Sequence, residues 1–284
     1  MRTKTLLIAV AALAAGILVS SAQTYSQNVV GYYNVTIPGT STSTGFYIVA
    51  NQFNVGVSNG LNEMFTSGLM SDVNAATNTL VYLWQPNSQV FASYQYFSAA
   101  DAAADAGGGA YENGAGFYDG NGVYITPIMP PGSAVFIQNL APGPITATVI
   151  GSVSQGTNKI TMVGSAGGAL NLVGSPIPVS TNVANAPISF VGTSDVNAAY
   201  NDVIFMWNPV SGVFAQYQYF NAADAAADAG GGAYENGAGF YDGNGAYQTT
   251  TVTPTVGTGF FIQHFGPNGD GTTETWTNIY TVPQ

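Results

Sequence analysis

The sequence contains very few charged residues, and cations are the rarest of them. Charged residues make up 6% of the 284, whereas about 25% is usual in soluble proteins. Two of the three cations, Arg2 and Lys4, lie at the N-terminus, so Lys159 alone faces 14 carboxylates over the rest of the chain, a formal charge of −13. Binding to nucleic acid requires clustered Lys and Arg that neutralise phosphates. The sequence therefore argues against nucleic-acid and other polyanionic partners.

Cysteine is absent, and histidine occurs once, as His264. The chain thus has no thiol nucleophile, disulfide or lipoprotein anchor, and it lacks the usual ligands of a zinc site. A catalytic triad would depend on His264, and a lone histidine beside Phe265 favours a structural role. Glu112 and Asp119 could still serve as the two carboxylates of a glycoside hydrolase, but their recurrence in both halves of the chain would imply two active sites. We therefore expect a protein that is not an enzyme.

Long apolar runs are missing after the first 22 residues. Residues 1–22 have the pattern of a signal peptide, with two cations, an apolar run from Thr5 to Val19 and small residues before Gln23. A run of about 15 residues is short for a membrane span. We expect the mature chain to begin at Gln23 without inserting into a membrane, and to be extracellular, periplasmic or bound to the cell surface.

Apolar and aromatic residues are abundant, at 46% and 12% of the chain, which is more than disordered chains carry. Short runs rich in β-branched and aromatic residues, bounded by Gly, Pro and Asn, predict strands. These runs are Thr79 to Trp84, Val90 to Phe97, Ala134 to Gln138 and Ile145 to Ile150. Aromatic residues alternate onto both faces of the Val90 to Phe97 run, which predicts a strand covered on both sides. The pattern indicates an all-β protein.

The sequence contains an internal repeat with an offset of 123 residues. Residues 71–97 align with 194–220 without gaps, and the 24 residues AADAAADAGGGAYENGAGFYDGNG at 99–122 recur unchanged 123 positions later. We expect two tandem units, residues 23–150 and 151–284. Each is predicted to be β-sandwich-like or β-barrel-like, with one or two short helices.

Each unit begins and ends with a strand-like motif. GFYIVANQF lies at 45–53, and PPGSAVFIQN closes the first unit, while the second closes with Val256 to Phe261 and lacks the proline. This order resembles an uncharacterised family of exported verrucomicrobial-type bacterial proteins with tandem β repeats. The resemblance implies export and a β-repeat fold, and it implies no known active site.

The duplicated segment predicts a capped helix of about two turns. Ser98 and Asn221 are good N-cap residues, and a carboxylate follows each of them three positions later. Asp101 suits the positive end of the helix. Asp105 lies in the last turn, where the helix dipole is negative and Asp101 is one turn away, so the helix does not explain it.

A bound cation is one way to compensate these carboxylates where Lys and Arg are scarce. Ca²⁺ takes six to eight oxygen ligands, but the FYDGNG motif lacks most of the ligand series of an EF-hand loop. A capped surface helix followed by a hairpin explains the same residues without a metal, so no cofactor is required and calcium is an alternative. The candidate metal ligands are Asp101, Asp105, Glu112, Asp119, Asp224, Asp228, Glu235 and Asp242.

Tyrosines around the acidic segment form a second candidate site. Glycan-binding surfaces use aromatic faces beside carboxylate and amide groups, and Gly-rich loops could expose such rings. The candidate ligand-binding residues are Tyr111, Tyr118, Tyr234 and Tyr241. Core packing explains Trp84, Phe97 and Phe117 more simply.

The leading hypothesis is a secreted or cell-surface structural or interaction protein without catalytic activity, which self-assembles or binds a cell-surface glycan. The alternative is a soluble glycan-binding module, with or without a dependence on calcium. A glycoside hydrolase that uses carboxylates alone is a remote alternative.

Overall fold

The computed structural model describes residues 29–65, 67–72, 76–108, 110–185, 188–195, 199–230 and 233–280. The predicted signal peptide lies outside these residues. In the residues that the structure describes, strands dominate, every sheet is antiparallel and none of the four sheets closes on itself, so the predicted all-β, sandwich-like fold is confirmed. Within the described residues, no helix is long and apolar enough to cross a membrane.

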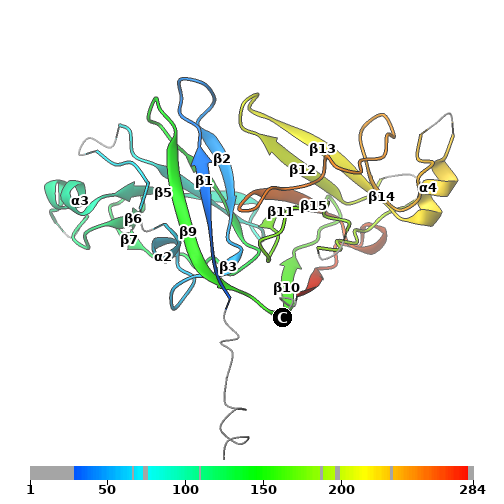
Figure 1. The fold of residues 1–284 in the computed structure, drawn as a ribbon, viewed down its shortest axis with the longest axis horizontal. Helices are drawn as coiled ribbons and strands as arrows, with labels where there is room; N and C mark the ends of the chain where they lie inside the picture. The colour runs from blue at the N-terminus through cyan, green and yellow to red at the C-terminus, as the bar shows by residue number, and fades with distance from the viewer. Residues whose placement is uncertain are drawn as a thin grey trace, which may run out of the picture.

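The first half of the chain contains nine strands and two short helices in the described residues (Figure 1). They are β1 (Val30–Ile37), β2 (Phe46–Ala50), β3 (Phe53–Asn54), α2 (Leu61–Met64), β4 (Leu80–Gln85), β5 (Val90–Phe97), α3 (Ala99–Asp105), β6 (Gly116–Tyr118), β7 (Tyr124–Ile125), β8 (Ala134–Gln138) and β9 (Ile145–Val153).

The second half repeats most of this order. Its elements are β10 (Gly156–Met162), β11 (Ala169–Gly174), β12 (Val203–Asn208), β13 (Val213–Phe220), α4 (Ala222–Asp228), β14 (Gly239–Tyr241), β15 (Gly259–His264), the 3₁₀ turn η1 (Pro267–Gly269) and β16 (Glu274–Tyr280).

Each half builds one large sheet and one small sheet. The large sheets have the orders β2-β8-β4-β5-β6-β7 and β11-β15-β12-β13-β14, and the small sheets have the orders β1-β9-β3 and β10-β16. The register also repeats, because Leu80 lies opposite Gln95 and Val203 lies opposite Gln218. All four positions keep the offset of 123 residues, so the repeat in the sequence is a repeat of structure.

Three of the five clusters of buried apolar side chains in the described residues form the body of the molecule. One lies within the first half and includes Phe53, Met64 and Phe117. A second lies within the second half and includes Phe190 and Trp276. A third draws on both halves and is centred on β2, β8, β11 and β15. The two halves therefore have their own cores and share a third.

The contacts between the halves come in equivalent pairs. The backbone N–H of Ala50 donates to Gly257 O at 2.8 Å, and that of Gly174 donates to Gly132 O at 2.9 Å. Bridges between the units join residue 49 to residue 258 and residue 133 to residue 173. Since each contact has a counterpart with the partners exchanged, the halves are related by an approximate twofold rotation, as in an isologous dimer.

Two tryptophans follow the same symmetry. Trp84 Nε1 donates to Leu170 O at 2.7 Å, and Trp207 Nε1 donates to Phe46 O at 3.0 Å. Each indole thus reaches from the central strands of its own sheet to the edge strand of the other half. These strand edges would otherwise present unpaired backbone groups.

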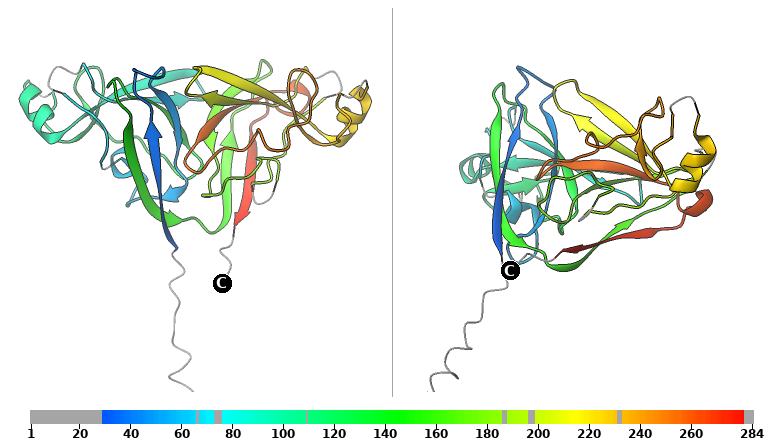
Figure 2. Two further views of the ribbon diagram at one scale, coloured as in Figure 1. Left: turned by 45° about the horizontal axis from the view of Figure 1, so that its top comes forward. Right: turned by 45° about the vertical axis from the view of Figure 1, so that its right-hand side comes forward.

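The duplicated 24-residue segments lie at the two far ends of this arrangement. α3 and α4, with the loops that follow them, are the parts most distant from the shared core (Figures 1 and 2). The start of β1 and the end of β16 lie close together on one side of the molecule. We call each duplicated segment, with its helix and loop, a tip.

Candidate functional site

Each tip starts with a capped helix, as the sequence predicts. In α3, Ser98 Oγ accepts from Asp101 N at 3.2 Å, and Asp101 Oδ2 accepts from Ser98 Oγ at 2.7 Å and from Ser71 Oγ. In α4, Asn221 Oδ1 accepts from Asp224 N at 2.9 Å, and Asn221 Nδ2 donates to Asp224 Oδ2 at 2.6 Å. Asp101 and Asp224 therefore satisfy hydrogen-bond donors at the helix starts, which accounts for them without a metal.

A small aromatic cluster fixes the loop over the helix. Phe97, Ala102 and Tyr118 are buried in the first tip, and Tyr111 packs on Phe97 with ring centroids 4.7 Å apart. The Tyr118 hydroxyl donates to Gly114 O at 2.5 Å. The second tip repeats the cluster and the hydrogen bond with its own residues.

The prediction that the tyrosines of the tips form an open ligand platform is wrong for Tyr118 and Tyr241, because both are fully buried. Tyr111 and Tyr234 are partly buried against the same clusters. The Gly-rich loops do not expose the rings; they fold back and cover the helix with them.

The carboxylates of each tip are spread out. Asp119 Oδ1 accepts from the backbone N–H groups of Val123 and Asn121, both at 2.9 Å, and these bonds hold the pKa of Asp119 below its usual value. Asp242 makes the same turn in the second tip. Asp105, Glu112 and their copies Asp228 and Glu235 are exposed.

No group of three or more acidic, histidine or cysteine side chains that could hold a metal occurs in the described part of the chain. The eight predicted metal ligands therefore do not converge through their side chains. Calcium binding at the tips stays a prediction from the sequence.

The one histidine forms a buried pair that sequence reasoning missed. His264 Nδ1 lies 2.9 and 3.0 Å from the two carboxylate oxygens of Asp202, and both side chains have no exposed surface. Thr193 N also donates to Asp202 Oδ2 at 2.9 Å, while His264 Nε2 lies 3.7 Å from Glu274 Oε2. Burial alone would lower the pKa of His264, but the hydrogen bond and charge of Asp202, together with Glu274, outweigh it and raise the pKa.

This pair is enclosed, so a substrate cannot reach the imidazole. The first unit has Thr79 and Asn139 at the positions that align with Asp202 and His264. The pair is therefore not part of the repeat, and the sequence carries no signal that its two members are in contact.

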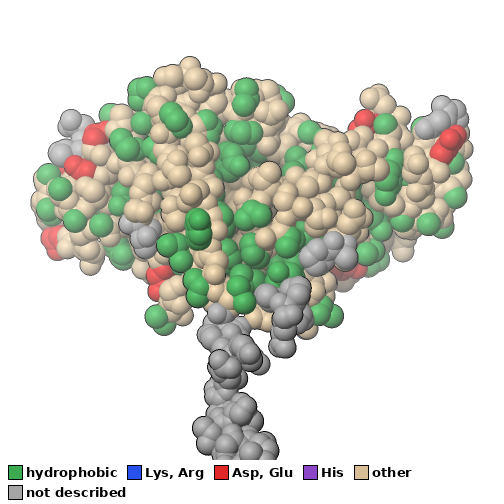
Figure 3. Space-filling model, viewed as in Figure 1, with side chains coloured by type: hydrophobic (Ala, Val, Ile, Leu, Met, Phe, Trp, Pro, Cys, Tyr) green, Lys and Arg blue, Asp and Glu red, His purple; other side chains and the backbone are tan. Residues whose placement is uncertain are grey.

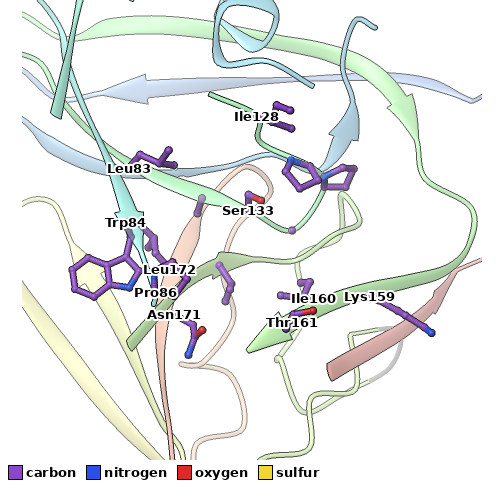
Figure 4. A pocket seen from close by; sticks show the side chains of 15 residues that line it. Leu83, Trp84, Pro86, Ile128, Ser133, Lys159, Ile160, Thr161, Asn171 and Leu172 are labelled. Carbon is purple, nitrogen blue, oxygen red and sulfur yellow. The ribbon is translucent and has the colours of Figure 1, made fainter. Parts of the chain in front are cut away.

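Clefts lie along the boundary between the halves. One has a volume of about 440 Å³, and Leu83 and Trp84 of β4, Ser133, Thr161 of β10 and Leu172 are among its lining residues (Figure 4). The Lys159 side chain is directed away from the others in this view. A smaller cleft of about 190 Å³ uses the equivalent positions Met206, Trp207 and Thr258.

Another cleft at this boundary is lined by aromatic side chains from both halves. Its volume is about 390 Å³. The lining residues are Phe46, Tyr82, Phe91, Phe136, Trp207 and Phe214. The sequence indicated the aromatic character of the strands but not the surface that they form together, because the pairing of the halves is not visible in it.

Comparisons of the chain with family models, with curated proteins and with solved structures found no match. The resemblance to an exported bacterial family with tandem β repeats therefore stays a prediction. Inferences about function depend on the geometry of the tips, the buried pair and the clefts.

Proposed function

We propose that this protein is an exported structural or interaction protein without catalytic activity, and that one chain presents the same binding surface twice. The observation that carries the proposal is the position of the identical segments at opposite ends of the molecule (Figure 2). In the described part of the chain, the hydrogen bonds and the shared apolar cluster between the halves are formed by residues outside these segments. Packing at the shared core thus gives no reason for their identity, whereas a shared external partner does.

The two tips face away from each other. One molecule is therefore better suited to connect two separate partners than to bind one partner with both tips. A molecule with two equal sites gains avidity only when both sites can be engaged together. Carboxylates gather near both ends of the surface, as Figure 3 shows. The tips therefore present the same acidic character to each side.

Charge restricts what can bind there. Lys159 is the only Lys or Arg after residue 4, so one copy of the chain has no basic patch to offer to the tip of another. Direct contact between two acidic tips is repulsive. Self-assembly through the tips therefore needs a bridging cation, and calcium is the natural one for oxygen ligands.

Sedimentation velocity and electron microscopy of the mature chain, with calcium and with a chelator, test this function. We expect calcium-dependent assemblies in which each molecule contacts two neighbours. The variants Asp105→Lys and Asp228→Lys reverse one exposed charge at each tip, and Lys in the last turn of a helix is compatible with the helix dipole.

Each single variant should stop growth at pairs, and the double variant should stay monomeric with an unchanged melting temperature. The proposal of assembly through the tips fails if the unmodified chain is monomeric at high concentration in both conditions. It also fails if the double variant assembles like the unmodified chain.

Binding of a neutral glycan is the second candidate. The cleft of about 440 Å³ favours it, because the cleft combines the indole of Trp84 with the hydroxyl-bearing residues Ser133 and Thr161. A glycan array with the unmodified chain and with Trp84→Leu tests it. Hits that disappear in the variant support the candidate, and an array without hits eliminates it.

A further inference from the structure

The aromatic cleft at the boundary between the halves is lined by four residues of the first half and two of the second. Phe91 and Phe214 occupy equivalent positions in β5 and β13, and both line it. Phe136 of β8 is the most buried of the residues that line the cleft, with 8% of its surface exposed, whereas Phe91 is 42% exposed. The cleft is thus open to solvent on one side and closed by Phe136 on the other.

The rings are arranged around Phe136 at steep angles. The rings of Phe46, Trp207 and Phe214 have centroids 6.0, 5.6 and 6.1 Å from that of Phe136. Their planes make angles of 87°, 80° and 87° with it. Phe91 lies 6.0 Å away at 77°. Four of the lining rings are thus steeply inclined to the buried ring of Phe136, and all six side chains that line the cleft are aromatic.

The polar atoms of the lining side chains are already used. The Tyr82 hydroxyl donates to Gln138 Oε1 at 2.9 Å, and Trp207 Nε1 donates to Phe46 O at 3.0 Å. No charged residue is among the six that line the cleft. An anion or a sugar would lose its hydrogen bonds to water on entry and find few in return.

We propose that this cleft binds an organic ammonium cation of the quaternary type. The methyl groups of such a cation need no hydrogen bonds, and the negative faces of aromatic rings attract its charge. The chain carries one cation against 14 carboxylates after its first four residues, so its overall field also favours a cation over a neutral or anionic ligand. A volume of about 390 Å³ leaves ample room for a trimethylammonium group.

Calorimetric titration with choline and with 3,3-dimethyl-1-butanol tests the proposal. The two probes have the same shape, but the alcohol has carbon in place of the charged nitrogen. We expect choline to bind at least about tenfold more tightly, the effect of a desolvated contact between a cation and aromatic rings. Equal binding of both probes overturns the proposal in favour of a purely apolar site, and the absence of choline binding overturns it outright.

A pair of matched variants locates the site. Trp207→Leu removes an indole that lines the cleft, and Trp84→Leu removes the equivalent indole, which is not among the lining residues. Both lose the same kind of hydrogen bond to the other half, so their effects on stability should be similar. Choline affinity should fall about tenfold in Trp207→Leu and change much less in Trp84→Leu.

An equal loss in both tryptophan variants would place the site elsewhere. Phe91→Leu provides a second variant in case Trp207→Leu does not fold, because Phe91 is the most exposed of the lining rings and its replacement disturbs the core least. It should weaken choline more than it weakens 3,3-dimethyl-1-butanol. Unchanged choline affinity in Phe91→Leu would contradict the proposal.

Discussion

At the scale of single residues, the buried pair of Asp202 and His264 is the least expected feature of a chain with so little charge. Removing two charges from water is costly, and a buried ion pair persists only with good geometry and further hydrogen bonds. Asp202 has such bonds from the backbone of Thr193 and Phe265. The first half has the uncharged residues Thr79 and Asn139 at the equivalent positions. The fold itself therefore does not require the charges.

The raised pKa of His264 predicts a pH dependence of stability. His264 holds its proton more tightly in the folded state than in the unfolded chain. The stability that protonated His264 contributes is therefore fully present below its unfolded pKa of about 6.5, and it is lost as the pH rises through its folded pKa. Denaturant unfolding between pH 5.5 and 9 should show the free energy of unfolding falling through this window. Asp202 and Glu274 face the ring, and the pKa of Asp270 is lowered mainly by its hydrogen bonds with Thr272 and to a smaller extent by the charge of His264.

The double variant Asp202→Thr with His264→Asn is the control, since it installs the pair found in the first half. We expect it to fold and to lose this part of the pH dependence, while the general effect of the net negative charge stays. Parallel pH profiles for the two proteins would show that His264 does not titrate as its surroundings require.

At the scale of secondary-structure elements, the sequence predicted the strands well and the placement of the tip tyrosines poorly. The predicted run from Val90 to Phe97 coincides with β5, and Tyr94 and Tyr96 pack on the first core, but the prediction that both faces are covered is wrong for the start of the strand, where Val90 and Phe91 are exposed. Alternation fixes which face a side chain takes because it depends only on local geometry. The burial of Tyr118 depends on a loop that folds back over α3, and glycine content alone does not predict the direction of a loop.

The carboxylates of α3 and α4 should differ in their contribution to stability. Asp101→Asn with Asp224→Asn weakens the hydrogen bonds at the helix starts and should lower the free energy of unfolding by about 1 kcal/mol per tip. Asp105→Asn with Asp228→Asn should leave it unchanged or raise it slightly, because exposed carboxylates are unfavourable in the last turn. Thermal melts of both double variants measure the difference.

The same melts, repeated with a chelator, separate helix effects from calcium. A chelator that lowers the melting temperature of the unmodified chain, but not that of the variant at 105 and 228, would assign a cation to these carboxylates. A marked loss of stability in that variant without calcium present would instead contradict the solvated position that the structure gives them.

At the scale of the whole molecule, the chain is a dimer of its own halves. Each half extends the loop before its closing strand into the other half. A Cβ added to Gly132 would lie 2.6 Å from Ile160 Cδ1, and one added to Gly257 would lie 2.6 Å from Tyr33 Cε2. The sequence shows that the closing motif is repeated. It does not show that the loop before each closing strand crosses to the other half, because a repeat does not say whether its copies are packed against each other.

This crossing predicts how the halves unfold. Gly132→Ala and Gly257→Ala each place a methyl group against the other half at a residue with φ of 93° or 81°, so each should cost about 1–3 kcal/mol. Gly143→Ala is the control, because a Cβ there meets no atom within 4 Å. Its effect should stay within about 0.5 kcal/mol.

Calorimetry should show a single transition for the unmodified chain, because the shared core couples the halves. In the double variant at 132 and 257, each half keeps its own core while the contact between them is strained, so the single transition should broaden or divide into two. The double variant could instead melt in one sharp transition at the temperature of the Gly143→Ala control. That result would mean that the loops around Gly132 and Gly257 contribute little to the coupling between the halves. The tryptophans at positions 84 and 207 and the backbone hydrogen bonds between the halves would then provide it.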